Sequence, residues 1–169
     1  MIESLSLEDQ VNLIKKKEIK IIELVDFYLD RIEKYNGTLN AIINLKDFDA
    51  IRDIANLKNK SLDNNLPLNG IPFAIKDVFN VVEFPTTEGL NINKNSLPMN
   101  NSIFVNRLQK KGAIIIGKTN TSELAIGSHT VNKIFGPTAN PYNHSLSAGG
   151  SSGGAAVSYT HLRAHETCL

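Results

Sequence analysis

The sequence predicts an α/β fold in which helices cover a sheet, and three observations support this. Apolar residues recur at helical spacing in several segments. Two short aliphatic runs, 71–75 and 113–116, have the length of buried strands. The second run directly follows an amphipathic segment, and a helix followed by a continuous aliphatic strand is typical of an α/β layer with parallel pairing. The 169 residues suffice for one domain with a sizeable core.

Three helices are expected in the first part of the chain. Ser6, followed by two acidic residues, is typical of a helix start because its hydroxyl can cap free amides. An apolar stripe predicts a second helix over residues 21–35, which Asn36 and Gly37 are expected to end. A weaker pattern predicts a third helix over residues 48–57.

The two strands are placed by the segments that precede them. A turn over residues 66–70 leads into the apolar run 71–75. Residues 101–111 predict a helix with Asn101 as its N-cap. A glycine ends that helix, and the run 113–116 then predicts a fully buried strand.

Composition excludes several classes of protein. The net charge is +1, so we expect no direct nucleic-acid partner and no attraction to anionic lipid. The single cysteine, Cys168, rules out an internal disulfide and a cysteine-based zinc site. The N-terminus lacks the pattern of a secretory signal, and no apolar run approaches the roughly 20 residues that cross a bilayer. We therefore expect a soluble cytoplasmic protein with no membrane partner.

Lys76 is the first candidate for chemistry, because it directly follows an apolar run. A lysine at the end of a buried strand must reach water or lose its charge, and a neutral amine can act as a base. The alternative is a solvated lysine paired with Asp77, since most lysines are exposed.

Residues 147–156, SAGGSSGGAA, are too rich in glycine and serine for an ordinary helix or strand. Such a stretch can be a flexible linker. A phosphate-binding loop is disfavoured, because the spacing of the known phosphate motifs is absent. The third interpretation is a catalytic turn, in which glycines allow a close backbone approach and serine hydroxyls relay protons. Composition alone leaves the linker and the turn equally open.

Four motifs in order resemble the amidase signature family: Gly70–Asp77, Gly112–Asn120, Phe135–Tyr142 and Gly149–Gly154. The match covers roughly residues 6–157. It implies that residues 1–156 are the N-terminal part of an amidase domain, a mixed sheet covered by helices that is incomplete relative to the family's fold.

The resemblance also implies a Ser–Ser–Lys triad that hydrolyses carboxamides. Lys76 would be the base, and Ser151, held after a cis peptide bond, would pass protons between Lys76 and the nucleophile. Ser152 would shape the turn, with Gly149, Gly150 and Gly153 permitting its close packing. The segment after the second strand lies near the acyl cleft in the family. The implied lining residues are Thr119, Ser122, Gly127, Ser128, Gly149, Gly150 and Ser152; the four in the segment 119–128 could instead serve as caps and turn residues.

The nucleophilic serine of the family lies roughly two dozen residues beyond the bridging serine, together with the oxyanion-hole amides. Counted from Ser151, that motif would fall past Leu169, so we expect the 169-residue chain alone to be inactive.

Residues 157–169, VSYTHLRAHETCL, differ sharply in composition from the preceding 156 residues. They resemble a translated sequencing adapter, and we interpret them as a non-native tail. The alternative is a metal pair, His161 and His165 with Glu166, but the composition break explains these residues without a metal.

The resemblance implies an amidase that acts on a small carboxamide substrate and needs no metal or organic cofactor. The alternative within the family is the amidase-like subunit of a glutamyl/aspartyl-tRNA amidotransferase, which releases ammonia from glutamine and works with partner subunits. Ala148, where that subunit more often has proline, favours a stand-alone amidase. A homodimer stays open, as does a non-catalytic fragment. The sequence does not identify the amide.

Overall fold

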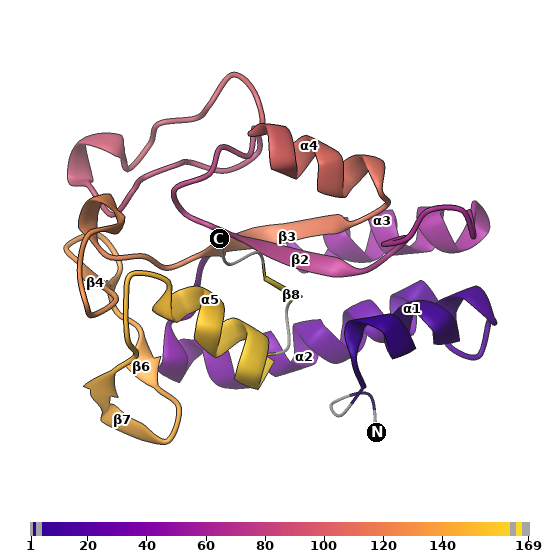
Figure 1. The fold of residues 1–169 in the computed structure, drawn as a ribbon, viewed down its shortest axis with the longest axis horizontal. Coiled ribbons are helices and arrows are strands. Elements are labelled where there is room, and N and C mark those ends of the chain that lie inside the picture. The colour runs from indigo at the N-terminus through magenta and orange to yellow at the C-terminus, as the bar shows by residue number, and fades with distance from the viewer. Residues whose placement is uncertain (1, 3–4, 163–164, 167–169) are drawn as a thin grey trace.

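A computed structural model describes residues 2, 5–162, 165 and 166. Its helical and extended elements alternate, as expected for an α/β fold (Figure 1). The helices are α1 (Leu7–Lys15), α2 (Ile21–Leu39), α3 (Phe48–Lys60), α4 (Ile103–Lys110) and α5 (Gly153–Val157), with short helical turns η2 (Asn91–Asn93), η3 (Glu123–Ala125) and η4 (Ser158–Leu162). The strands are β1 (Ile42–Leu45), β2 (Pro72–Lys76), β3 (Ile114–Thr119), β4 (Val131–Asn132), β5 (Gly136–Pro137), β6 (Ala139–Asn140), β7 (Asn143–Ser147) and β8 (His165–Glu166).

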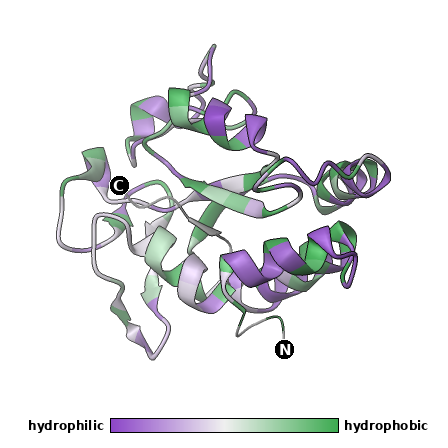
Figure 2. Cartoon of the chain, turned by 45° about the vertical axis from the view of Figure 1, so that its right-hand side comes forward, coloured by the Kyte–Doolittle hydropathy of each residue, from purple (hydrophilic) through white to green (hydrophobic). Residues whose placement is uncertain are grey.

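The main sheet has the strand order β1-β3-β2-β8 and is mixed, which confirms the predicted fold class. Strand β3 pairs in parallel with β2 and antiparallel with β1. Helix α4 lies above the sheet in Figure 1, and α1, α2 and α5 lie below it. The strands β2 and β3 are buried along their whole length. Figure 2 accordingly shows hydrophobic colour concentrated on the central strands and mixed colour on the helices.

The start of α1 forms as expected. The Ser6 hydroxyl accepts a hydrogen bond from the Asp9 amide, and the Asp9 carboxylate accepts one from the Ser6 amide, which completes a capping box. The Ser6 hydroxyl and amide both donate to the Asp9 carboxylate, and these bonds hold the pKa of Asp9 below its ordinary value.

The predicted end of the second helix is wrong. Helix α2 continues through Asn36 and Gly37 to Leu39, and Asn40 takes the left-handed conformation with φ 49°. Asn36 therefore does not end the helix. Its Oδ1 instead accepts hydrogen bonds from the amides of Ala41 and Ile42, so it secures the connection to β1 from within the helix.

Asn101 is not the N-cap of α4; that position belongs to Ser102. The Asn101 side chain is engaged elsewhere, because its Oδ1 accepts from the amide of Val82 at 2.8 Å and its Nδ2 donates to Asn106 and Gln109. No helix of the described residues is both long and apolar enough to span a membrane.

Candidate active site

The candidate site forms where β2 ends beside the glycine-rich turn. Lys76 is the last residue of β2 and is 8% exposed. Its Nζ donates to Ser151 Oγ at 2.9 Å and to Ser152 Oγ at 2.7 Å. Residues 75 positions apart in the sequence are thus brought into direct contact, and the second serine is as close as the first.

The turn around Ser151 is packed, so the flexible-linker interpretation is wrong. The peptide bond between Gly150 and Ser151 is cis. Gly153, Gly154 and Ala155 are buried. A Cβ on Gly154 would come within 2.4 Å of the Asn120 backbone nitrogen, so only glycine allows this approach.

The segment after β3 holds the turn from the other side. Thr121 Oγ1 donates to the Ser151 carbonyl oxygen at 3.0 Å, and the Ser122 amide donates to the same oxygen at 3.4 Å. Further along, Thr130 Oγ1 donates to the Gly149 carbonyl at 2.9 Å and accepts from the Gly153 amide at 2.7 Å. These contacts fix the backbone on both sides of the two serines.

The expected lining residues differ in their surroundings. The hydroxyls of Thr119 and Ser122 are buried and have no hydrogen-bond partner among the described residues. Gly127 and Ser128 are exposed, although the Ser128 carbonyl accepts from the Gly150 amide at 2.9 Å. The two hydroxyls are therefore enclosed by the protein and do not reach its surface.

Close packing was expected at three glycines and is found at two. A Cβ on Gly150 would come within 2.6 Å of the Gly127 carbonyl oxygen, and one on Gly153 within 2.5 Å of Thr130 Oγ1. At Gly149 the expectation is wrong, because nothing lies within 4 Å of the corresponding position.

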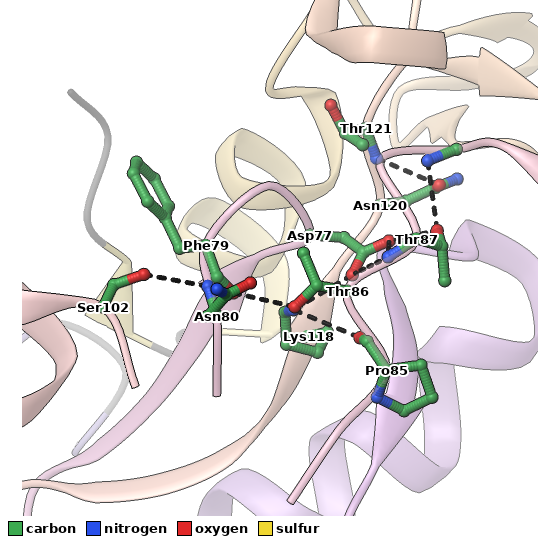
Figure 3. A network of polar contacts seen from close by, with 11 residues as sticks. Asp77, Phe79, Asn80, Pro85, Thr86, Thr87, Ser102, Lys118, Asn120 and Thr121 are labelled. Carbon is green, nitrogen blue, oxygen red and sulfur yellow. Dashed lines mark hydrogen bonds and ion pairs between the residues drawn. The ribbon is translucent and has the colours of Figure 1, made fainter. Parts of the chain in front are cut away.

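The alternative pairing of Lys76 with Asp77 is also wrong. Asp77 forms its ion pair with Lys118, with Nζ and Oδ1 3.0 Å apart and both side chains 0% exposed. Figure 3 shows Lys118 between Asp77, Thr86 and Pro85. Sequence reasoning missed Lys118, although it closely follows an apolar run, from which only Gly117 separates it. Burial lowers the pKa of the Lys118 amine from its ordinary value, and the nearby Asp77 carboxylate opposes that effect.

No set of three or more His, Cys, Asp or Glu side chains within the described part of the chain could hold a metal ion. The alternative metal site needs His165 and Glu166, whose side chains lie outside the described residues. A surface hollow of about 500 Å³ between the ends of α1 and α3 is lined by Lys17, Lys20 and Lys60, and it shares no residue with the serine turn. The candidate site is therefore defined by side-chain contacts and not by this hollow.

The site is thus a buried strand-end lysine that donates to two serines on a glycine-rich turn. Comparison with known proteins gives the family. The family model for amidases matches residues 23–159, and the chain belongs to this family.

The chain is 40% identical over 154 residues to a subunit of the glutamyl-tRNA(Gln) amidotransferase of Lawsonia intracellularis, covering 91% of this chain and 32% of that protein. Among solved structures, a bacterial aryl acylamidase of the amidase signature family superposes with a TM-score of 0.82 at 30% identity, covering 94% of this chain and 34% of the other. The native peptide amidase of Stenotrophomonas maltophilia also gives a TM-score of 0.82 at 30% identity, covering 92% and 34%. This chain therefore spans about a third of the length of these relatives.

Proposed function

We propose that the whole protein hydrolyses a carboxamide to a carboxylate and ammonia or an amine, in the cytoplasm. The observation that carries this proposal is the hydrogen bond of 2.9 Å between Lys76 Nζ and Ser151 Oγ. In the proposed mechanism the neutral Lys76 amine accepts the Ser151 proton, while Ser151 accepts the proton of an attacking serine. The attacking serine in this proposal is the one that the family resemblance places roughly two dozen residues beyond Ser151. Thr119 and Ser122 are the proposed lining residues, and contact with a substrate would require a movement that exposes their buried hydroxyls.

The test is amide hydrolysis by the whole protein, measured as ammonia or amine release from a panel of carboxamides. We expect Lys76→Met and Ser151→Ala each to lower kcat by about 10³-fold or more, because the proton path is interrupted. Lys46→Met and Ser145→Ala are matched controls outside the site and should leave kcat unchanged. Full activity in Lys76→Met would refute the mechanism.

The 169-residue chain alone should not react covalently with a serine-directed fluorophosphonate, because two triad members without a nucleophile cannot form an acyl-enzyme. Labelling that is abolished by Ser151→Ala or Lys76→Ala would contradict this expectation. The assignment of residues 157–169 as a non-native tail stays a prediction, and resequencing of the gene tests it.

A second candidate is favoured by the 40% identity to an amidotransferase component. In this role the amide would be that of glutamine, and the ammonia would pass to a misacylated tRNA held by partner subunits. Ala148 still favours a stand-alone enzyme. Glutaminase activity that rises when partner subunits and charged tRNA are added would support the amidotransferase role. Rapid turnover of other carboxamides by the isolated protein would support the first candidate.

A further inference from the structure

A second lysine lies near the end of the strand next to the one that carries Lys76. In the parallel pairing of β2 with β3, Ile75 lies opposite Lys118 and Lys76 lies opposite Thr119. Successive side chains in a strand point to opposite faces of the sheet. Lys118 therefore lies on the face opposite to Lys76, where it meets Asp77.

The Lys118 amine has three acceptors for its three N–H groups. These are Asp77 Oδ1 at 3.0 Å, Thr86 Oγ1 at 3.2 Å and the Pro85 carbonyl oxygen at 3.3 Å. A buried ammonium group is tolerated when it is paired and fully hydrogen-bonded. This arrangement therefore fits the charged form of Lys118 (Figure 3).

Both the carboxylate and the backbone of Asp77 are hydrogen-bonded. Its carboxylate accepts from the Thr87 hydroxyl and from the Thr87 amide, the latter at 3.2 Å. Its backbone amide donates to the Thr119 carbonyl and its carbonyl accepts from the Glu88 amide, both at 3.1 Å. The pair thus ties the end of β2 both to β3 and to residues 85–88.

We propose that Lys118 is a positioning residue for Lys76: by closing a neutral pair with Asp77, it fixes the end of β2 and cancels the carboxylate charge of the residue that follows Lys76, on the opposite face of the sheet. This inference rests on the proposed role of Lys76 as the base. Without the counter-charge, the neighbouring carboxylate would favour protonated Lys76, and a protonated amine cannot accept the Ser151 proton.

Other charged groups belong to the elements around β2. Lys46 follows β1 and forms an ion pair with Glu83. Helix α5, which packs on β2, carries no titratable side chain. Strand β8 contributes His165 and Glu166, whose side chains lie outside the described residues. The charged residue next to Lys76 in the sequence is Asp77, and Asp77 is paired with Lys118.

The test is an NMR pH titration of lysine Cε resonances in the 169-residue chain, with the Lys76 signal assigned by its loss in Lys76→Arg. Lys118→Met should raise the Lys76 titration midpoint by about one pH unit, because Asp77 is left uncompensated. Asp77→Asn should lower it by a similar amount, because Lys118 then faces no carboxylate. The double variant removes both charges, so its Lys76 titration midpoint should return toward that of the parent chain.

Lys46→Met removes a lysine near the same sheet and is the matched control, for which no change is expected. A merely structural role of the pair would give losses of stability in both single variants without opposite shifts of Lys76. Equal midpoints in all variants, or shifts of the same sign, would overturn the proposal. If Lys118→Met does not fold, Asp77→Asn and the double variant still test the predicted lowering and its reversal.

The titration needs no turnover, so it separates this inference from the proposed function. Opposite shifts together with an inactive whole protein would refute the amidase proposal and support the coupling between the pair and Lys76. If the whole protein is active and the Lys76 titration midpoint is the same in all variants, the inference is overturned and the proposed function is not.

Discussion

At the scale of single residues, two lysines that look alike in the sequence have different surroundings. Each lies just after an apolar run, yet Lys76 donates to two serine hydroxyls and Lys118 to a carboxylate, a hydroxyl and a carbonyl. A hydroxyl relays protons readily, whereas a buried carboxylate stabilises the charged amine. The partners of the two lysines therefore decide their different chemistry.

Gly154 gives a prediction at this scale. Gly154→Ala should destabilise the chain by about 1–3 kcal/mol or more, because the new methyl group meets the Asn120 backbone. Gly149→Ala is the matched control in the same turn, where the added Cβ meets nothing within 4 Å. Urea unfolding followed by circular dichroism measures both variants. Equal stability of the two would show that the turn around Ser151 is looser than these contacts indicate.

The site could be predicted in part from the sequence. The contact between Lys76 and Ser151 follows from the order of motifs, because the resemblance supplies long-range information. The bond from Lys76 to Ser152 and the pair of Asp77 with Lys118 were missed. The pair depends on strand register, which residue spacing alone does not fix, and the bond to Ser152 depends on the conformation of the turn before α5.

At the scale of elements, the connection from α2 to β1 depends on Asn36. Asn36→Ala should lower the free energy of unfolding by about 2 kcal/mol, because the amides of Ala41 and Ile42 lose their acceptor. The neighbouring Gly37→Ala is the control and should raise stability by up to about 1 kcal/mol, since Gly37 is helical and its Cβ position is free. Denaturant midpoints check both. An Asn36→Ala variant with an unchanged free energy of unfolding would refute the role assigned to this side chain.

The same asparagine shows why some element boundaries could not be predicted. Asn and Gly together are typical of a helix end, but the contacts of Asn36 with Ala41 and Ile42 override that local preference. Strand β1 was not predicted for a related reason: it is short and only its first residue is fully buried. Helices α1 and α3 and strands β2 and β3 formed at the predicted places, because apolar patterns reflect burial directly, although α3 and β3 each run three residues past their predicted ends.

At the scale of the whole molecule, stability should be uneven. Strand β3 lies between two partners and is buried throughout, whereas the β6–β7 hairpin is largely exposed. Hydrogen exchange followed by mass spectrometry should therefore find the slowest amides in β3 and fast exchange in β6 and β7. Fast exchange in β3 would show that the chain does not hold this sheet by itself in solution.

The one-residue offset between the two strand-end lysines has a consequence for insertions and deletions. If β3 were one residue longer before Lys118, the charged Lys118 amine would lie on the same face as the Lys76 amine, and it would oppose protonation of Lys76. Asp77 would then lose its cation. Changes of length should thus be tolerated in the loops of this protein and not within the six residues of β3.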